Sequence, residues 1–355
     1  MNRKNIRRAI LYVCRSLGLF AIARLVTADQ LRILAYHGIS LDDEHVHMPG
    51  LFMRPETVRN RLKILTRNSY PVLPLREALQ RLNSGTLPSC ATVLTYDDGF
   101  YGNYKHWSAL YEECPLPSTI YVTTYYVIKT TPVFRLAIQY MFLKSTRSEL
   151  VLDGLPGVTP GLLDLKDVDR KTSCMWELIL HAESALNESE RVLLGRELGS
   201  RLGMSFEQLA MYRGLSLMNF NEIRDLSKRG VDIQLHTHRH RFPPDRECVT
   251  QEIKDNRAAL EQLVDGPLDH MCYPSGVFSP LQWKWLEQLG VKSATTCEPG
   301  LNGSQTPRFA LRRFLDAESI SEIEFEAELS GFSDVCRRIL GRRPRASVSP
   351  HSHGR

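Results

Sequence analysis

Residues 91–99 read ATVLTYDDG, an apolar and β-branched run that predicts a buried strand, followed directly by two carboxylates and a glycine. Asp97 and Asp98 repel each other and resist burial unless a cation or a proton compensates. Within a strand they would face opposite ways, but at a strand end Gly99 permits a sharp turn that aims both into one pocket. A helix cap or an ordinary turn explains the pair equally well.

Similar strand patterns recur along the chain and alternate with helical periodicity. Strand patterns lie at 31–36, 118–124, 231–235, 270–273 and 292–295, and helical patterns at 55–68, 104–114, 220–229 and 249–263. This alternation predicts an α/β fold with a parallel sheet or barrel, in which functional groups collect at the carboxyl ends of the strands. The helix-rich stretch at about 131–217 breaks the rhythm and predicts an inserted helical lobe within a domain of residues 31–330.

The composition is that of a globular protein, and its charge is concentrated at the two ends. The 355 residues are 43% hydrophobic and 24% charged, with a formal net charge of +5. Residues 1–30 and 334–355 each carry six Lys or Arg against one acid, so the body between them is near −5. A mildly acidic body argues against nucleic-acid binding. Eight cysteines without a C-x-x-C pair favour a reducing compartment.

The N-terminal arm, residues 1–30, has the pattern of a basic amphipathic helix. Apolar side chains recur at helical spacing from Ile6 to Phe20, whereas Arg15 and Arg24 interrupt the apolar run that a signal peptide requires. Such a helix either docks on its own domain or lies on an anionic membrane surface. We therefore expect a cytoplasmic protein with at most peripheral membrane contact. Residues 331–355 are rich in Arg, Pro and Ser and predict a basic disordered tail.

Three histidines fall within HTHRH, residues 236–240, directly after a predicted strand. His236 and His240 have a spacing that suits two imidazoles on one cation, and Pro243 prevents a long helix, so the ligands would come from a loop. A solvated histidine-rich loop is the alternative. A single histidine, His37, ends the first strand and is expected at the same edge of the sheet, although lone histidines are more often structural.

One carboxylate and two imidazoles form a three-ligand set that leaves positions open for water and substrate. The second carboxylate then stays free as a base. Such donors suit zinc, with cobalt, iron and nickel as alternatives. A metal-activated water attacking a carbonyl is hydrolytic chemistry that needs no Ser or Cys nucleophile.

These motifs resemble those of the polysaccharide deacetylases, also called the NodB-homology family or carbohydrate esterase family 4. TYDDG (95–99) is similar to the T-F-D-D-G motif, HTHRH to the H-[ST]-x-x-H motif, and CYPSG (272–276) to the Y-P-x-G variant of a third motif. The resemblance runs from about Arg32 to Leu315, interrupted by the helical lobe. It implies a distorted (β/α) barrel.

The resemblance also implies roles for individual residues. Asp97 matches the catalytic base, and Asp98, His236 and His240 match the metal ligands. His37 is similar to the histidine that acts as general acid in the branch that deacetylates poly-N-acetylglucosamine. The residues of the third motif that would bind substrate and oxyanion are Ser275, Tyr273 and Gly276.

The chain departs from the family pattern at two places. Cys272 stands where the motif arginine orients the base, and Arg312 or Arg313 is the candidate substitute. The late leucine–histidine motif has no counterpart, which leaves His37 as the only source of the acid.

The leading hypothesis is a metal-dependent deacetylase acting on an N-acetylated sugar of a polysaccharide, oligosaccharide or glycolipid. A catalytically impaired glycan-binding relative and an amidase acting on non-sugar acyl amides are the alternatives. The expected partners are the glycan substrate and, through the N-terminal arm, a membrane surface, but no nucleic acid.

Overall fold

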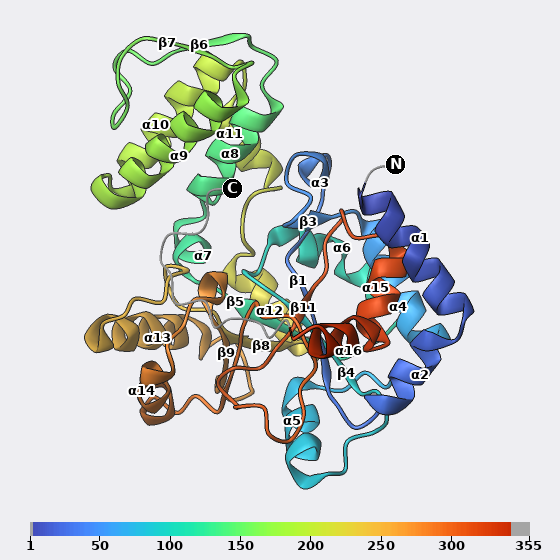
Figure 1. The fold of residues 1–355 in the computed structure, drawn as a ribbon. Helices are drawn as coiled ribbons and strands as arrows, with labels where there is room; N and C mark the ends of the chain where they lie inside the picture. The colour runs from blue at the N-terminus through green and yellow to red at the C-terminus, as the bar shows by residue number, and fades with distance from the viewer. Residues whose placement is uncertain (1–2, 342–355) are drawn as a thin grey trace.

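A seven-stranded parallel sheet forms the centre of the computed structural model, which describes residues 3–341 (Figure 1). The strand order is β10-β9-β8-β5-β4-β1-β11, and every pairing in it is parallel. The strands are β1 (Arg32–Tyr36), β4 (Thr92–Tyr96), β5 (Ser118–Val122), β8 (Asp232–Leu235), β9 (His270–Cys272), β10 (Ser293–Thr295) and β11 (Phe314–Leu315). All residues of β1, β4 and β5 are buried, as expected for parallel strands covered on both faces.

The segment that includes β11 brings the two ends of this sheet together. Leu311 exchanges backbone hydrogen bonds with the β10 region, donating to Ala294 at 3.0 Å and accepting from Thr296 at 2.9 Å. Three residues later Phe314 pairs with Leu34 of β1. The curled sheet confirms the predicted fold class, a distorted (β/α) barrel, and it places the segment 311–315 beside both β10 and β1.

Helices cover the barrel and follow the predicted alternation closely. Those between or beside the strands are α4 (Pro55–Arg67), α5 (Leu75–Ser84), α6 (Tyr101–Tyr111), α12 (Phe220–Lys228), α13 (Arg246–Leu260) and α14 (Trp283–Gln288), with the short α3 (Glu44–His47) and α7 (Tyr125–Lys129) and the 3₁₀ turns η1 (Pro274–Gly276) and η2 (Pro280–Gln282). A small parallel pair, β2 (Gly38–Ile39) and β3 (Phe52–Met53), lies beyond the end of β1.

A group of helices stands to one side of the barrel, at the upper left of Figure 1. It contains α8 (Phe134–Lys144), α9 (Val168–Ala185), α10 (Glu188–Leu202) and α11 (Phe206–Tyr212), with an antiparallel hairpin of β6 (Glu149–Val151) and β7 (Leu162–Asp164). Helix α8 packs against α9 and α10, and α10 packs against α11. These elements occupy the stretch in which the sequence predicts an inserted lobe; the domain boundaries themselves stay a prediction.

The two ends of the described chain pack on each other. Helices α1 (Arg3–Ser16) and α2 (Leu19–Val26) lie against α15 (Glu322–Leu329) and α16 (Phe332–Ile339). Phe20 of α2 stacks near Phe332 of α16, with ring centroids 5.0 Å apart.

The prediction of a disordered tail from residue 331 is therefore wrong for its first part. Because Phe332 has an apolar partner and Arg337 bonds Glu328 at 2.9 Å, the segment 332–339 is held as a helix. Residues 342–355 lie outside the described residues.

Candidate active site

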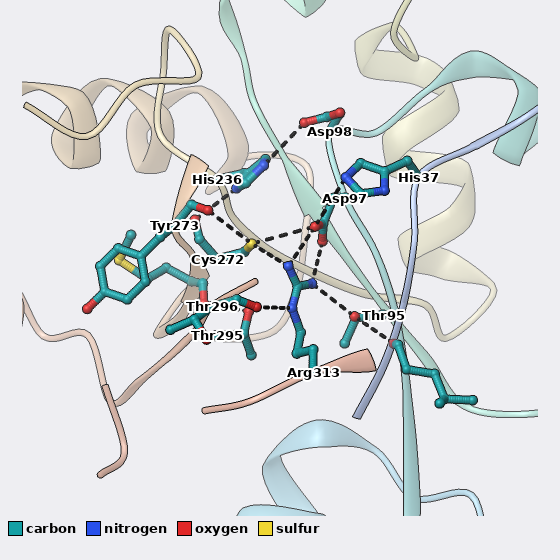
Figure 2. A network of polar contacts seen from close by, with 12 residues as sticks. His37, Thr95, Asp97, Asp98, His236, Cys272, Tyr273, Thr295, Thr296 and Arg313 are labelled. Atoms are coloured by element: carbon teal, nitrogen blue, oxygen red, sulfur yellow. Dashed lines mark hydrogen bonds and ion pairs between the residues drawn. The ribbon is translucent and has the colours of Figure 1, made fainter. Parts of the chain in front are cut away.

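The carboxyl ends of β1, β4 and β8 bring together the three motifs singled out in the sequence (Figure 2). His37 follows β1, Asp97 and Asp98 follow β4, and the loop of residues 236–240 follows β8. The turn after β4 is the one expected from its glycine: Asp98 and Gly99 both have left-handed φ, 68° and 85°, and Gly99 N–H donates to the Asp97 carbonyl at 2.9 Å. The turn places both carboxylates at the carboxyl end of β4, Asp97 beside His37 and Arg313, and Asp98 beside His236 and His240.

Asp98, His236 and His240 form a candidate metal centre. The Nε2 atoms of both histidines lie 3.2 Å from the same carboxylate oxygen, Asp98 Oδ1. That oxygen is buried, yet it makes no hydrogen bond of acceptable geometry within the described part of the chain. A buried carboxylate oxygen without a donor, faced by two imidazole nitrogens, is the arrangement that a divalent cation would satisfy.

Hydrogen bonds to Cys272 and Asn256 fix the orientation of His236. Its Nδ1 lies 2.8 Å from the Cys272 carbonyl, so a proton on Nδ1 leaves the lone pair of Nε2 free for a cation beside Asp98. Its backbone N–H donates to Asn256 Oδ1 at 2.9 Å, and the Asn256 amide donates to the Val122 carbonyl. His238, the middle histidine of the loop, points away and bonds Thr124 Oγ1 at 2.8 Å.

Backbone strain is concentrated at this site. Among residues 3–341, eight residues other than glycine have positive φ, and four of these are Asp98, Thr237, His240 and Ser275, with φ between 52° and 68°. Each such conformation costs of the order of 1 kcal/mol and persists only where the surrounding structure enforces it. The strain therefore marks these loops as shaped for a function rather than for stability.

Asp97 is held as an anion by Arg313. The guanidinium donates to both carboxylate oxygens, Nη1 to Oδ1 at 2.7 Å and Nη2 to Oδ2 at 2.8 Å, and its Nε donates to the Thr296 carbonyl at 2.9 Å. Burial raises the pKa of Asp97, but the charge and hydrogen bonds of Arg313 outweigh burial, and the pKa lies below its ordinary value. Of the two arginines proposed as substitutes, Arg313 makes this contact, whereas Arg312 packs beside Gly300.

Cys272 occupies the space beside this ion pair. Its Sγ lies 3.6 Å from Asp97 Oδ2 and accepts from Arg313 Nη2 at 3.1 Å. Asp97, His236 and Cys272 form a second group of potential ligands, within 4.8 Å of one another. Because the cationic Arg313 already occupies both oxygens of Asp97, the Asp98 group fits a metal ion better.

His37 faces Asp97 from the neighbouring strand, with Nε2 3.8 Å from Oδ2. Asn103 on α6 fixes the backbone around it: the amide donates to the His37 carbonyl at 2.9 Å, and Oδ1 accepts from the Ile39 N–H at 3.1 Å. The imidazole is thus within reach of a group bound between Asp97 and the candidate metal centre.

The turn at 273–276 carries the three residues predicted to bind substrate and oxyanion, a role that stays a prediction. Tyr273 N–H donates to the Thr295 carbonyl and Gly276 N–H donates to the Tyr273 carbonyl, so both amides are already used within the fold. The Tyr273 ring is fully buried, and its hydroxyl donates to the Phe309 carbonyl. Ser275, with φ of 56°, is left as the residue of the three whose N–H has no acceptor within the described chain.

The supporting residues Asn256 and Glu252 were not identified from the sequence. Both lie on α13 among its buried positions, together with Val249, Ile253 and Leu260. Glu252 accepts from the backbone N–H and the guanidinium of Arg239 in the histidine loop. The sequence does contain a signal for them, because both are polar residues at positions where the helical pattern would place apolar ones.

Comparison with known proteins gives one family. Residues 210–294, which include the histidine loop and the turn at 273–276, match the family model described as polysaccharide deacetylase. Among curated proteins, none matches the sequence. The family resemblance expected from the sequence is thereby confirmed; its assignment to the Y-P-x-G branch stays a prediction.

Solved structures share the fold at low identity. PplD, a deacetylase of Streptococcus pyogenes solved in complex with acetate, has a TM-score of 0.55 and 16% identity over 85% of this chain and 99% of its own. A de-N-acetylase from Aggregatibacter actinomycetemcomitans gives 0.52 and 13%, over 84% and 99%. IcaB from Ammonifex degensii gives 0.52 and 14%, over 86% and 97%. These structures show the shared fold, and the family match is to the polysaccharide deacetylases.

Proposed function

We propose that this protein is a metal-dependent deacetylase that removes the N-acetyl group from an amino sugar of a polysaccharide, oligosaccharide or glycolipid. The observation that carries the proposal is the difference between two adjacent carboxylates. Arg313 binds both oxygens of Asp97, while the buried Oδ1 of Asp98 faces two imidazoles and accepts no hydrogen bond within residues 3–341. One carboxylate is thereby suited to accept a proton and the other to hold a cation.

Asp98, His236 and His240 would hold the ion, for which we propose zinc. A divalent ion at that position would polarise the acetyl carbonyl and lower the pKa of a water molecule. Asp97 accepts the proton of the attacking water, and because Arg313 keeps it ionised, it is ready as a base at neutral pH.

The other steps use Ser275 and His37. As water oxygen bonds to the acetyl carbon, the N–H of Ser275 is available to stabilise the oxyanion. Cleavage of the carbon–nitrogen bond requires a proton on the departing amine, which His37 supplies. The products are acetate and the free amino sugar.

Arg313 also argues against the alternative of an impaired glycan-binding relative. Cys272 stands where the family motif has an arginine. The contact with Asp97, the proposed base, is made instead by Arg313, the residue before β11. The loss of the motif arginine therefore does not imply the loss of turnover.

Metal content and acetate release, measured together on the purified protein, test the proposal. We expect close to one equivalent of a divalent transition metal and release of acetate from N-acetylglucosamine oligomers. Asp98→Ala/His240→Ala should lose both. The matched control is His238→Ala in the same loop. The His238 ring bonds Thr124 rather than Asp98, so this variant should keep both the metal and the release of acetate.

Each other outcome has a distinct meaning. Metal without acetate release from any sugar, but with turnover of simple acyl amides, would favour the amidase. Metal without any turnover would favour a binding protein. A protein that takes up no metal even after reconstitution would refute the proposed centre.

A further inference from the structure

Helices α1 and α2 expose an unusual number of large apolar side chains. In the described chain, eight of the 22 exposed large hydrophobic residues fall between residues 6 and 26, and the other 14 are spread over residues 46–340. Scattered exposed apolar residues are normal in folded proteins, but a contiguous group marks an interaction surface. The group is Ile6, Ile10, Tyr12, Val13, Leu17, Ile22, Leu25 and Val26, which are 41–79% exposed.

The opposite face of the same helices is already engaged with the protein. Leu11 and Phe20 are buried in a small cluster with Ile323 and Ala327 of α15. On this side Arg8 and Arg15 pair with Glu324 and Glu326, at 3.3 Å and 3.2 Å. The pair of helices is therefore fixed to the barrel by one face and presents the other outward, along the outer edge at the right of Figure 1.

The charge around the exposed face indicates what covers it. Residues 3–26 contain six Lys or Arg and no acidic residue. Arg3 is exposed beside the apolar face, and Arg7, whose Nε lies 3.8 Å from Glu324 Oε1, still keeps 64% of its side chain exposed. Apolar side chains bordered by cations suit the headgroup region of an anionic bilayer, where the former enter the acyl boundary and the latter meet phosphate.

The geometry favours a position on the membrane over one across it. No single described helix is long and apolar enough to span a bilayer; α1 and α2 together pass that test by length and composition, but they are bent by 75°. A span would also have to remove Leu11 and Phe20 from their cluster and break the pairs of Arg8 and Arg15 with α15.

We propose that the outer face of α1 and α2 docks this protein on an anionic lipid surface, with the two helices lying in the plane of the interface. The proposal is independent of the proposed deacetylase function, since it uses none of the residues of the site.

The test measures co-sedimentation of the full chain with vesicles of phosphatidylcholine alone and of phosphatidylcholine mixed with phosphatidylglycerol. We expect binding to the mixed vesicles that weakens with salt, and little binding to the neutral ones. Ile10→Asp/Val13→Asp/Leu17→Asp, which places charge on three residues 56–69% exposed, should reduce binding by at least about tenfold.

A matched control carries the same added charge elsewhere. Leu193→Asp/Met211→Asp/Leu281→Asp replaces residues that are 60–83% exposed and distant in sequence from the helix pair, and it should bind like the wild type. Thermal unfolding of all three proteins checks that each is folded.

Three results would overturn the proposal. One is a failed binding test, with either no binding to anionic vesicles or an equal loss of binding in the control variant. Another is self-association that the three aspartate substitutions at residues 10, 13 and 17 abolish, seen by sedimentation equilibrium without lipid. A second copy of the chain would then cover the exposed face. The third is retention in cell membranes after an alkaline wash, which would indicate a spanning segment.

Discussion

Two buried arginine–aspartate pairs lie near β11, and they differ in what they do to their carboxylates. Arg313 binds both oxygens of Asp97, at 2.7 and 2.8 Å, whereas Arg61 binds one oxygen of Asp316 through Nε at 2.8 Å and gives its Nη2 to the Ile320 carbonyl. Burial raises the pKa of both carboxyls, yet the pKa of Asp97 ends below its ordinary value and that of Asp316 rises to about 6.

The difference shows that a nearby cation is not sufficient to keep a buried carboxylate ionised. Asp97 receives two guanidinium nitrogens and faces the imidazoles of His37 and His236, while Asp316 has one guanidinium nitrogen and the unfavourable charge of Glu318. A guanidinium that binds both carboxylate oxygens prepares a base. A single contact of the same length supports the fold only.

Asp97→Asn should have the largest effect on activity. Asparagine keeps the shape but cannot accept the proton, so acetate release should fall by about 10²–10⁴-fold while metal content stays at the wild-type level. Steady-state kinetics and elemental analysis on one preparation measure both. Asp316→Asn is the matched control, because it neutralises the other buried aspartate; equal losses in the two variants would remove Asp97 from the mechanism.

His37→Asn should lose about 10²-fold on amides and much less on esters. An alkoxide or phenolate leaves with less need of a proton than an amine, so a general acid matters most for the amide. Acetate release from an acetylated amino sugar and from 4-nitrophenyl acetate gives the two rates. A uniform loss on both substrates would assign His37 to structure or binding.

Arg313→Gln should reduce turnover by about 10²-fold near neutral pH and move the acidic limb of kcat/KM to higher pH. Without Arg313, the main influence that offsets burial is lost and the pKa of Asp97 rises, so the base is protonated at pH values at which the wild type is active. The pH profile separates positioning from general damage. Arg61→Gln, the counterpart in the other pair, should lower the unfolding temperature but leave the limb unmoved.

Asp316→Asn should change the pH dependence of stability rather than the rate. A carboxyl whose pKa is raised on folding stabilises the protein at low pH and loses that contribution as the pH rises from 3.8 to about 6. Urea unfolding across this range should show a decline of up to about 3 kcal/mol in the wild type that is reduced in the variant. An unchanged pH dependence would contradict the assigned pKa.

Cys272→Ala should have the smallest effect. The thiol touches Asp97 and Arg313, but these two hold each other without it, so we expect a rate change of less than about tenfold. A larger loss, with metal content reduced, would instead give Cys272 a part in ion binding.

Short local motifs explain why much of the site could be predicted from the sequence. Asp97 and Asp98 are adjacent, and His236 and His240 lie four residues apart in one loop. Each motif follows an apolar strand that the pattern predicts. Arg313 could only be named as one of two candidates, because which arginine points into the barrel depends on how β11 closes the ring. The hydrogen bonds of the Tyr273 and Gly276 amides, to the Thr295 and Tyr273 carbonyls, could not be predicted either, because residue types do not encode which backbone groups meet.

The fold shows the same limit at its ends. Arg, Pro and Ser after residue 331 predict disorder, yet Phe332 finds an apolar partner in Phe20, far away in sequence. The amphipathic pattern of the N-terminal arm predicts a helix with two faces, but only the structure shows that Leu11 faces the barrel and Val13 faces outward.

The backbone of Asp98 and His240 has positive φ, which limits the residues that fit at these two positions without strain. At both positions glycine suits the backbone better than the residue that the chemistry requires. Replacing either proposed ligand by glycine should therefore make the metal-free protein more resistant to unfolding while it removes a ligand of the proposed metal centre. At these two positions the proposed metal site and the stability of the chain therefore favour different residues.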